Sequence, residues 1–288
     1  PKGRAEIIEV EGDKEIIVVI PTADFNGKYA KECRENIFKG LHIIFVESGF
    51  PKDPYFNCAH NFNVGIKKAM EYNPKWIVVS NDDMVKIDEI SILVENLKTI
   101  DPQKVNVVLA KNNKNNFQNG SRMKICQLNI FGKLAIGLLS ITHLYKCSKI
   151  LEQFLIINKI NEHFGNKLII LFAQMSVFFS KFFKTKYNYT NFEDFGIFSS
   201  SFVKKTEMFF DETYINAHED HDLSIRLSFN PEQISFVNFK IKGVGGQSLG
   251  SNFCRGLRTI ASDSYFNFKW KEKLGAMYVN MMDYPTPH

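Results

Sequence analysis

The sequence predicts an α/β fold in which a mostly parallel sheet is flanked by helices. Two observations support this prediction. Short apolar, β-branched runs alternate with helical patterns over residues 15–110, as in a parallel sheet covered by helices on both faces. Three of these runs are followed by polar turn residues, which would meet at the edge where open sheets bind ligands.

Four buried strands are expected in this region because each run is apolar throughout and stops at turn residues. The runs span residues 15–20, 41–46, 76–79 and 105–110. Apolar residues at helical spacing predict helices over residues 28–39, 57–72 and 87–99. The polar residues 1–14 are expected to form a frayed arm or an edge strand.

The turn after the third strand is the first candidate for chemistry. Residues 76–79 lead through Ser80 into Asn81, Asp82 and Asp83. Carboxylates in this place suit a hard divalent cation, which keeps some waters and binds substrate phosphate oxygens. Asn and Asp are also common turn residues, so a turn that only ends the strand is the alternative.

The turns after the first two strands are expected to line the same crevice. Pro21 and Thr22 end the first strand, and Glu47 ends the second. The sequence contains neither the glycine-rich dinucleotide fingerprint nor the phosphate loop of nucleoside triphosphatases. Phosphates would therefore be held in another way, and a metal ion on Asp83 would do so.

A second acidic cluster lies in the last third of the chain. At the start of a predicted helix, two histidines, His218 and His221, are interspersed with three acids, Glu219, Asp220 and Asp222. Capping and the helix dipole favour one or two acids there, whereas three acids with two histidines indicate a general base. The other elements expected in this region are strands at 198–203 and 234–241 and a helix at 258–273.

Residues 122–186 are locally basic and rich in Ile, Leu and Phe. They hold ten Lys and Arg against two acids, a net +8, which leaves −3 for the rest of a chain of net charge +5. Amphipathic helices here would fit an anionic membrane surface, or they would pack on the domain or on a second subunit. Nucleic acid is disfavoured because basic and aromatic residues are not interleaved for stacking.

The cysteine usage and the N-terminus predict a cytoplasmic protein. The basic segment also allows peripheral attachment to the inner face of the membrane. The five cysteines are odd in number and scattered, as expected for reduced thiols. No secretory signal is expected from the polar N-terminus. The apolar stretches 134–145 and 168–180 are shorter than the roughly 20 residues of a membrane span.

Seven short motifs follow one another in a recognisable order. They occupy residues 18–22, 45–49, 63–69, 80–83, 210–212, 219–226 and 265–270. In this order they resemble the inverting nucleotide-sugar glycosyltransferases of family 2, which have the GT-A fold. The resemblance covers residues 15–110 and 190–275. It implies a nucleotide-sugar-binding half at 1–110, a basic, mainly helical insert at 111–189 and an acceptor and catalytic half at 190–288.

The resemblance also implies a role for each matched residue and a set of ligands. Asp220 would be the general base, with Glu219 and Asp222 orienting it and the acceptor. Asp83 would bind Mn²⁺ or Mg²⁺, with Asp82 near the metal or the ribose. The ligands would be a nucleotide-diphosphate sugar and a glycan or lipid-linked acceptor. The expected donor-binding residues are Pro21, Thr22, Glu47, Asn63, Asn81 and Asp82.

One departure from the family pattern concerns the metal. Many relatives have a metal-binding His where this chain has Gly243 or Val244; His218, His221 and Gln247 are the candidates for contributing a ligand instead. Two other hypotheses therefore stay open. The chain could be a catalytically silent relative used as a membrane or assembly module, or a sugar nucleotidyltransferase, although it lacks a glycine-rich triphosphate loop.

Overall fold

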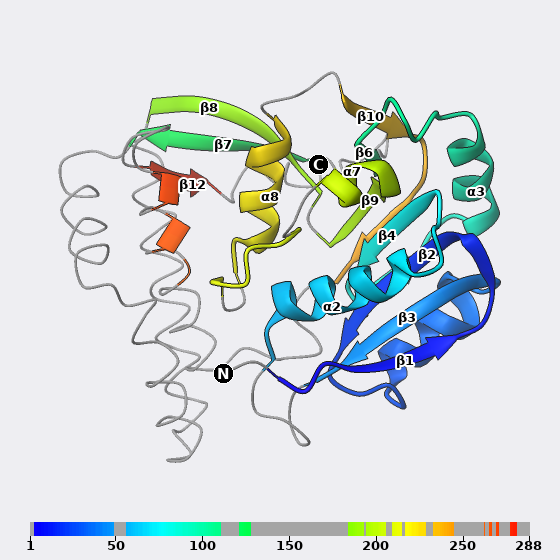
Figure 1. The fold of residues 1–288 in the computed structure, drawn as a ribbon. Coiled ribbons are helices and arrows are strands. Elements are labelled where there is room, and N and C mark those ends of the chain that lie inside the picture. The colour runs from blue at the N-terminus through cyan, green and yellow to red at the C-terminus, as the bar shows by residue number, and fades with distance from the viewer. Residues whose placement is uncertain are drawn as a thin grey trace, which may run out of the picture.

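The computed structural model describes residues 3–48, 56–110, 121–127, 184–192, 194–205, 209–214, 217–228, 233–244, 262, 265–266, 269–270 and 277–280. Its centre is a seven-stranded mixed sheet with helices on both faces (Figure 1). The first half contributes β1 (Glu6–Val10), β2 (Asp13–Thr22), α1 (Lys28–Glu32), the π-helix η1 (Cys33–Ile37), β3 (Leu41–Glu47), α2 (Cys58–Met70), β4 (Trp76–Ser80), β5 (Met84–Lys86), α3 (Ile90–Lys98) and β6 (Val107–Ala110). The second half contributes β7 (Ser121–Gln127), β8 (Lys184–Asn191), β9 (Phe195–Ser199), α7 (Ser200–Lys205), α8 (Glu219–Ser228), β10 (Ile234–Val237), β11 (Ile241–Gly243) and β12 (Met277–Asn280).

The strand order in the main sheet is β1-β3-β2-β4-β9-β6-β10. The pairs β3–β2, β2–β4 and β6–β10 are parallel, whereas β1 and β9 run antiparallel to their neighbours. The predicted α/β class and the four strands and three helices of residues 15–110 are confirmed. The polar N-terminal arm is confirmed as an edge strand, β1.

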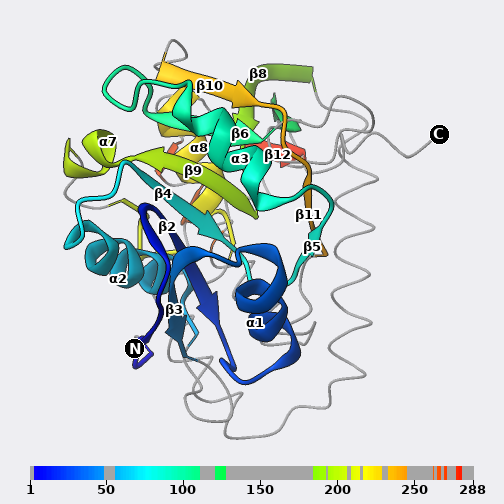
Figure 2. The ribbon, with the colours of Figure 1, turned by 90° about the vertical axis from the view of Figure 1, so that its right-hand side faces the viewer.

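The alternation of side chains along the strands builds a separate core on each face of the sheet. Along β2, Val18 and Ile20 belong to one core, and Ile17 and Val19 belong to the other. Helices α1 and α3 cover the first face (Figure 2), and α2, α7 and α8 cover the second. Because β2, β3 and β4 are buried on both faces, their sequences are continuous apolar runs.

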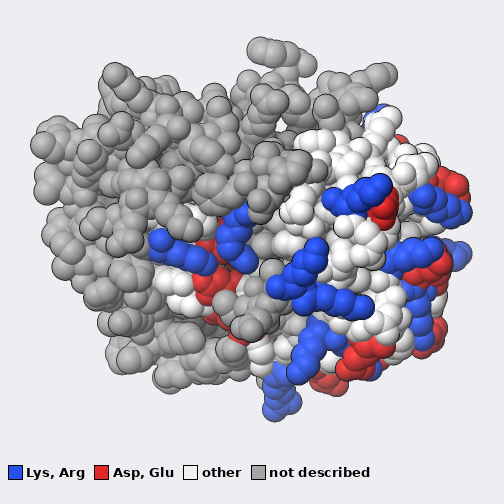
Figure 3. All heavy atoms as spheres, turned by 45° about the horizontal axis from the view of Figure 1, so that its top comes forward, with Lys and Arg blue, Asp and Glu red and all other residues white. Residues whose placement is uncertain are grey.

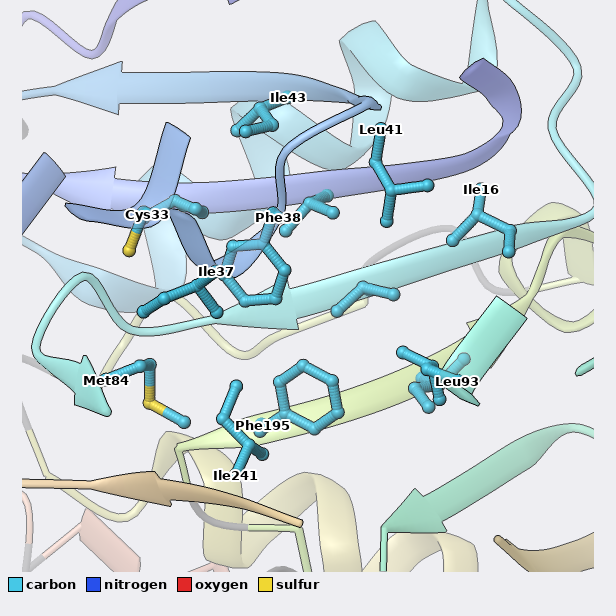
Figure 4. Packing of buried hydrophobic residues seen from close by; sticks show 14 of the residues in the cluster. Ile16, Cys33, Ile37, Phe38, Leu41, Ile43, Met84, Leu93, Phe195 and Ile241 are labelled. Atoms are coloured by element: carbon cyan, nitrogen blue, oxygen red, sulfur yellow. The ribbon is translucent and has the colours of Figure 1, made fainter. Parts of the chain in front are cut away.

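The first core also fixes the small β5–β11 sheet. Figure 4 shows Met84 and Ile241 beside Ile37 and Phe195 of the main fold. Strands β5 and β11 pair antiparallel, with Gly243 opposite Met84. This pairing holds the segment after β11 against the turn that follows β4.

Two predictions for the second half were wrong in detail. Residues 198–203 are not one strand: β9 ends at Ser199, and the helix α7 follows at once. The predicted strand 234–241 is two short strands, β10 and β11, which belong to different sheets. The predicted helix at Glu219 is confirmed as α8, and Ser262, Tyr265, Phe266, Lys269 and Trp270 are helical, as expected for residues 258–273.

The basic segment was predicted to be mainly helical, but its described ends are strands. Strands β7 and β8 pair with each other, and β7 also pairs with β12. The apolar stretches 134–145 and 168–180 lie outside the described residues. On the face drawn in Figure 3, the Lys and Arg of the described part are interspersed with Asp and Glu. Within that part, no helix is long and apolar enough to cross a membrane.

Candidate functional site

The carboxyl ends of β2, β3 and β4 meet at one edge of the sheet, as the parallel pairing requires. Thr22 lies opposite Glu47 in the β2–β3 register. The hydroxyl of Thr22 donates to Oδ2 of Asp82 at 2.8 Å. Thr22, Glu47 and Asp82 are all buried. The structure therefore brings together the three turns that the sequence singled out.

Pro21 helps to open this edge between β2 and β4. The β2–β4 ladder extends to the pair Val19–Val79 and stops before Pro21. Pro21 still pairs with Val46 of β3. Because a proline has no N–H for a ladder bond, it is tolerated in this central strand where the pairing with β4 has already ended. Beyond this point the chains of β2 and β4 diverge into the turns that carry Thr22 and Asp82.

Glu47 is held by the loop that follows β2. Its Oε1 accepts the backbone N–H of Phe25 at 2.8 Å. Arg34 donates to the carbonyl of Phe25 at 2.6 Å, and its guanidinium lies 4.5 Å from the centre of the Phe25 ring. Glu47 thus fixes the loop between β2 and α1, and this contact accounts for one of its two oxygens.

Asn81 binds a carboxylate that the sequence analysis did not single out. Its side-chain amide donates to Oδ1 of Asp194 at 2.6 Å, and its backbone N–H donates to the Asp194 carbonyl at 2.9 Å. Asp194 directly precedes β9, which pairs antiparallel with β4. These two bonds fix Asp194 to the turn that carries Asp82 and Asp83.

The second carboxylate oxygen of Asp194, Oδ2, packs on Gly243. A Cβ built on Gly243 would lie 2.7 Å from Cγ of Asp194 and closer still to Oδ2. Only glycine leaves the room that this carboxylate occupies. Next to it, the N–H of Val244 donates to the carbonyl of Asp83 at 2.9 Å. Asp194 therefore lies between the turn after β4 and the end of β11.

The electrostatics around Asp194 connect the two halves of the chain. Burial raises the pKa of Asp194, and the negative charges of Asp83 and Asp220 raise it further, to about 6. The hydrogen bond from Asn81 acts in the opposite direction. Asp83 and Asp220 come from distant parts of the sequence, yet both lie close enough to act on one carboxylate.

The first turn of α8 carries Glu219 and Asp220 into this region. Burial and the charge of Asp220 raise the pKa of Glu219 to about 7. Its Oε2 is buried and has no hydrogen-bond partner among the described residues. Burial, Glu219 and Asp220 also raise the pKa of Cys58, a free thiol at the start of α2. The acids of α8 therefore lie near α2 as well as near Asp194.

The backbone just before α8 is strained. His218 has a φ of 68°, in the left-handed region that is uncommon for residues other than glycine. Its carbonyl accepts the N–H of Asp222 at 2.8 Å, and its ring packs 5.1 Å from that of Phe266. Such strain persists where the surroundings impose it, often at functional sites. Here it sets the direction in which α8 leaves the site.

Asp222 points away from Asp220 into a buried polar network. Its oxygens accept hydrogen bonds from Tyr214, Arg226, Lys269 and Trp270 at distances between 2.9 and 3.2 Å. Lys269 also bonds Oδ2 of Asp211 at 2.8 Å. The structure therefore places Asp222 where it anchors α8 to the C-terminal helical residues.

Asn63, predicted to bind the donor, lies in a different environment. Its side chain donates to the carbonyl of Phe210 and to Oε1 of Glu212, and it accepts the N–H of Phe210. These three bonds of 2.9 to 3.0 Å engage both the nitrogen and the oxygen of the amide, and they hold α2 to residues 209–214. The structure does not bring Asn63 to Thr22 and Asp82.

The oxygen ligands at this edge of the sheet fit a hard cation, although they are few. Carboxylate oxygens of Asp83 and Asp194 are the ligand type that Mg²⁺ and Mn²⁺ prefer. In the described part of the chain, no group of three His, Cys, Asp or Glu side chains could hold a metal ion. His218 and His221 pack against each other, with ring centres 5.3 Å apart, and Gln247 lies outside the described residues.

Sequence reasoning missed Asp194 and gave no role to Lys269. Asp194 follows Glu193 just before an apolar strand, a pattern that resembles any strand boundary. Lys269 lies in one of the seven motifs, but its two carboxylate partners are 58 and 47 residues away. Only the folded chain shows these contacts.

The fold and the site together define an α/β protein with a mixed seven-stranded sheet and a cluster of acidic residues at the carboxyl edge of its parallel strands. A scan against protein-family models, a search of curated proteins and a search of solved structures found no match for the chain.

Proposed function

We propose that the chain is a metal-dependent, inverting glycosyltransferase of the GT-A fold. It would transfer a sugar from a nucleoside-diphosphate sugar to a hydroxyl of a glycan or a lipid-linked sugar. The single observation that supports this most is that the polar turns after β2, β3 and β4 meet at one edge of the sheet, where Thr22 donates to Asp82, the residue before the proposed metal ligand Asp83. The proposed base, Asp220, lies in the first turn of α8.

The proposed chemistry assigns each step to a group of this chain. Asp220 takes the proton of the acceptor hydroxyl, which must lie within hydrogen-bond reach. The hydroxyl oxygen then bonds to the anomeric carbon from the face opposite the diphosphate. The bond from that carbon to the diphosphate oxygen breaks, its electron pair leaves with the nucleoside diphosphate, and the configuration inverts.

The other residues would hold the reactants. Thr22, Glu47 and Asp82, which lie together at the carboxyl edge of the sheet, would hold the nucleoside half of the donor. Asp83 would hold Mn²⁺ or Mg²⁺, and a bound cation would stabilise the charge on the departing diphosphate. Asp222 would keep α8 in place through its four donors rather than contact the acceptor.

The basic segment suggests where the acceptor is found. Its net charge of +8 would attract an anionic membrane surface, on which a lipid-linked sugar is carried. We accordingly propose a cytoplasmic enzyme that binds the inner face of the membrane peripherally. A contact with a second subunit is the alternative for this segment.

Replacing Asp220 by Asn tests the catalytic role. The amide cannot take the proton, so transfer should fall by about 10² to 10⁴-fold, while the affinity for the donor stays close to that of the unmodified chain. Product formation and donor binding are measured separately. Glu95→Gln, an exposed site on α3, serves as the control. An Asp220→Asn variant with full transfer activity would remove Asp220 from its role.

A catalytically silent relative is the second candidate, and one observation favours it. Gly243 and Val244 lie against Asp194 and Asp83, where family members carry a metal-binding His. A silent relative would bind sugar nucleotides weakly or not at all, so donor binding in the presence of Mn²⁺ separates the two candidates.

A further inference from the structure

The small number of metal ligands near Asp83 raises the question of what else holds the cation. Among the described residues no trio of His, Cys, Asp or Glu can do so. A two-carboxylate site remains compatible with Mg²⁺-type chemistry. This ion commonly takes one or two protein carboxylates and completes its shell with waters and substrate phosphates.

Asp194 has the position and the support that a second ligand requires. Its Oδ1 accepts from Asn81 at 2.6 Å, which leaves Oδ2 as the oxygen over Gly243. A carboxylate held through one oxygen by an amide can present the other to a cation in a fixed direction. Asn81 belongs to the same turn as Asp83, so its bonds hold Asp194 against the turn that carries Asp83.

The room for this carboxylate depends on the absence of a side chain at position 243. Gly243 pairs with Met84, the residue after Asp83, and a Cβ there would take the place of Oδ2. The end of β11 therefore contributes no side chain of its own and leaves space for the Asp194 carboxylate.

A second acidic group of the chain, Asp222 and Asp211, is already paired with a cation of the protein. Asp222 and Asp211 lie in contact with the cationic side chain of Lys269 at 2.8 to 2.9 Å, and Arg226 adds a further bond to Asp222. Asp194, by contrast, takes its side-chain hydrogen bond from the neutral amide of Asn81, and its Oδ2 packs on Gly243. A divalent cation between Asp83 and Asp194 would supply the positive charge that Lys269 supplies to the other pair.

We propose that Asp194 is the second protein ligand of the cation bound by Asp83, with its Oδ2 facing the metal and Asn81 orienting it. The inference rests on the proposed function, because diphosphate oxygens of the donor would supply further ligands to the cation. It follows that Mn²⁺ alone binds weakly and that a nucleoside diphosphate strengthens its binding.

The test is Mn²⁺ binding measured by the electron paramagnetic resonance signal of the free ion, with and without UDP, GDP or dTDP. The unmodified chain should bind Mn²⁺ more tightly when one of the diphosphates is present. Asp194→Asn keeps an acceptor for Asn81 but loses the charge, and it should weaken Mn²⁺ binding by about tenfold or more. Gly243→Ala should weaken binding in the same direction, because its Cβ displaces the carboxylate without removing it.

Two controls keep the test independent of folding. Glu95→Gln on the exposed face of α3 should leave Mn²⁺ binding unchanged. The Asp194→Asn variant should melt no lower than the unmodified chain in EDTA, since it removes a buried like charge. A variant that merely damaged the fold would melt lower in EDTA.

The outcomes separate the inference from the proposed function. Mn²⁺ binding that Asp194→Asn leaves within twofold while Asp83→Asn abolishes it would overturn the inference and leave the function standing. Mn²⁺ binding that depends on Asp194 but not on any diphosphate would support the ligand and overturn the function. A chain that binds no Mn²⁺ under any of these conditions would overturn both.

Discussion

At the scale of single residues, the carboxylates of Asp222 and Asp194 lie in two different environments. Asp222 is fully buried and accepts hydrogen bonds from four side chains, two of them cationic. Asp194 accepts one from Asn81 and lies near other acids. The first arrangement stabilises a fold, whereas the second is typical of a site that receives a positive charge.

Asp222→Ala should therefore be among the most destabilising substitutions in the described chain. It removes the acceptor of the Trp270 indole N–H and one of the two carboxylates that Lys269 bonds. Breaking a buried charge pair in this way costs about 3 to 5 kcal/mol. Urea unfolding should show this loss, with Glu95→Gln within about 0.5 kcal/mol of the unmodified chain. A loss below 1 kcal/mol for Asp222→Ala would contradict the anchoring role.

At the scale of elements, Gly65 shows how closely α2 packs on the sheet. A Cβ on this residue would lie 2.9 Å from Cγ2 of Val46 and nearer still to Cγ1 of Val19. Gly65→Ala gains up to about 1 kcal/mol of helix propensity, but overpacking in a dense core costs about 1 to 3 kcal/mol. We expect a net destabilisation, measured by thermal or urea unfolding. A more stable Gly65→Ala variant would show that α2 can move away from β2 and β3.

The elements also show what the sequence could predict. Apolar runs and helical spacing located β2, β3, β4, β6, α2 and α3, because each of these elements buries one continuous or periodic set of side chains. Residues 198–203 were misassigned because Phe198, Phe202 and three serines have no decisive period. The small sheet that joins β5 to β11 connects strands 3 residues long, too short to leave a pattern.

The candidate site was predictable only in part for a similar reason. The positions of Thr22, Glu47 and Asp82 follow from parallel pairing, which a strand prediction already implies. The contact between Asn81 and Asp194 joins residues 113 apart, and no local pattern specifies it. The same applies to Lys269, whose two carboxylates come from different segments.

At the scale of the whole molecule, the shifted carboxyl groups predict how stability depends on pH. Burial alone would raise the pKa of Asp211, but hydrogen bonds from Lys269, Tyr265 and the Thr213 backbone lower it to about 2. A lowered pKa contributes stability that is present above the unfolded value of 3.8 and is lost as the pH falls through about 2.

Asp194 and Glu219 act in the opposite direction. Their folded pKa values of about 6 and about 7 are above the unfolded values of 3.8 and 4.5. Their contribution is present at low pH and is lost as the pH rises through about 6 and about 7. In EDTA, thermal stability should therefore be highest at weakly acidic pH and should decline towards neutrality. Asp194→Asn should make that decline shallower, and a melting temperature that rises from pH 5 to pH 7.5 would contradict this account.

The basic segment makes a further prediction for the whole chain. If residues 122–186 bind an anionic membrane, the protein should co-sediment with vesicles that contain phosphatidylserine, and less so as salt rises. Vesicles of phosphatidylcholine alone are the control. Co-sedimentation that is equal for both lipids, or that is insensitive to salt, would contradict electrostatic attachment, and no co-sedimentation with either lipid would favour the alternative contact with a second subunit.

The most direct test of the central claim is a thermal-shift panel of UDP-, GDP- and dTDP-sugars with and without Mn²⁺. A donor present at about 100 times its dissociation constant should stabilise the chain by about 2.7 kcal/mol. We predict that sugars of one nucleotide raise the melting temperature, that Mn²⁺ increases the shift, and that Asp83→Asn removes the part that depends on Mn²⁺. No shift with any sugar nucleotide in Mn²⁺ would contradict the glycosyltransferase proposal.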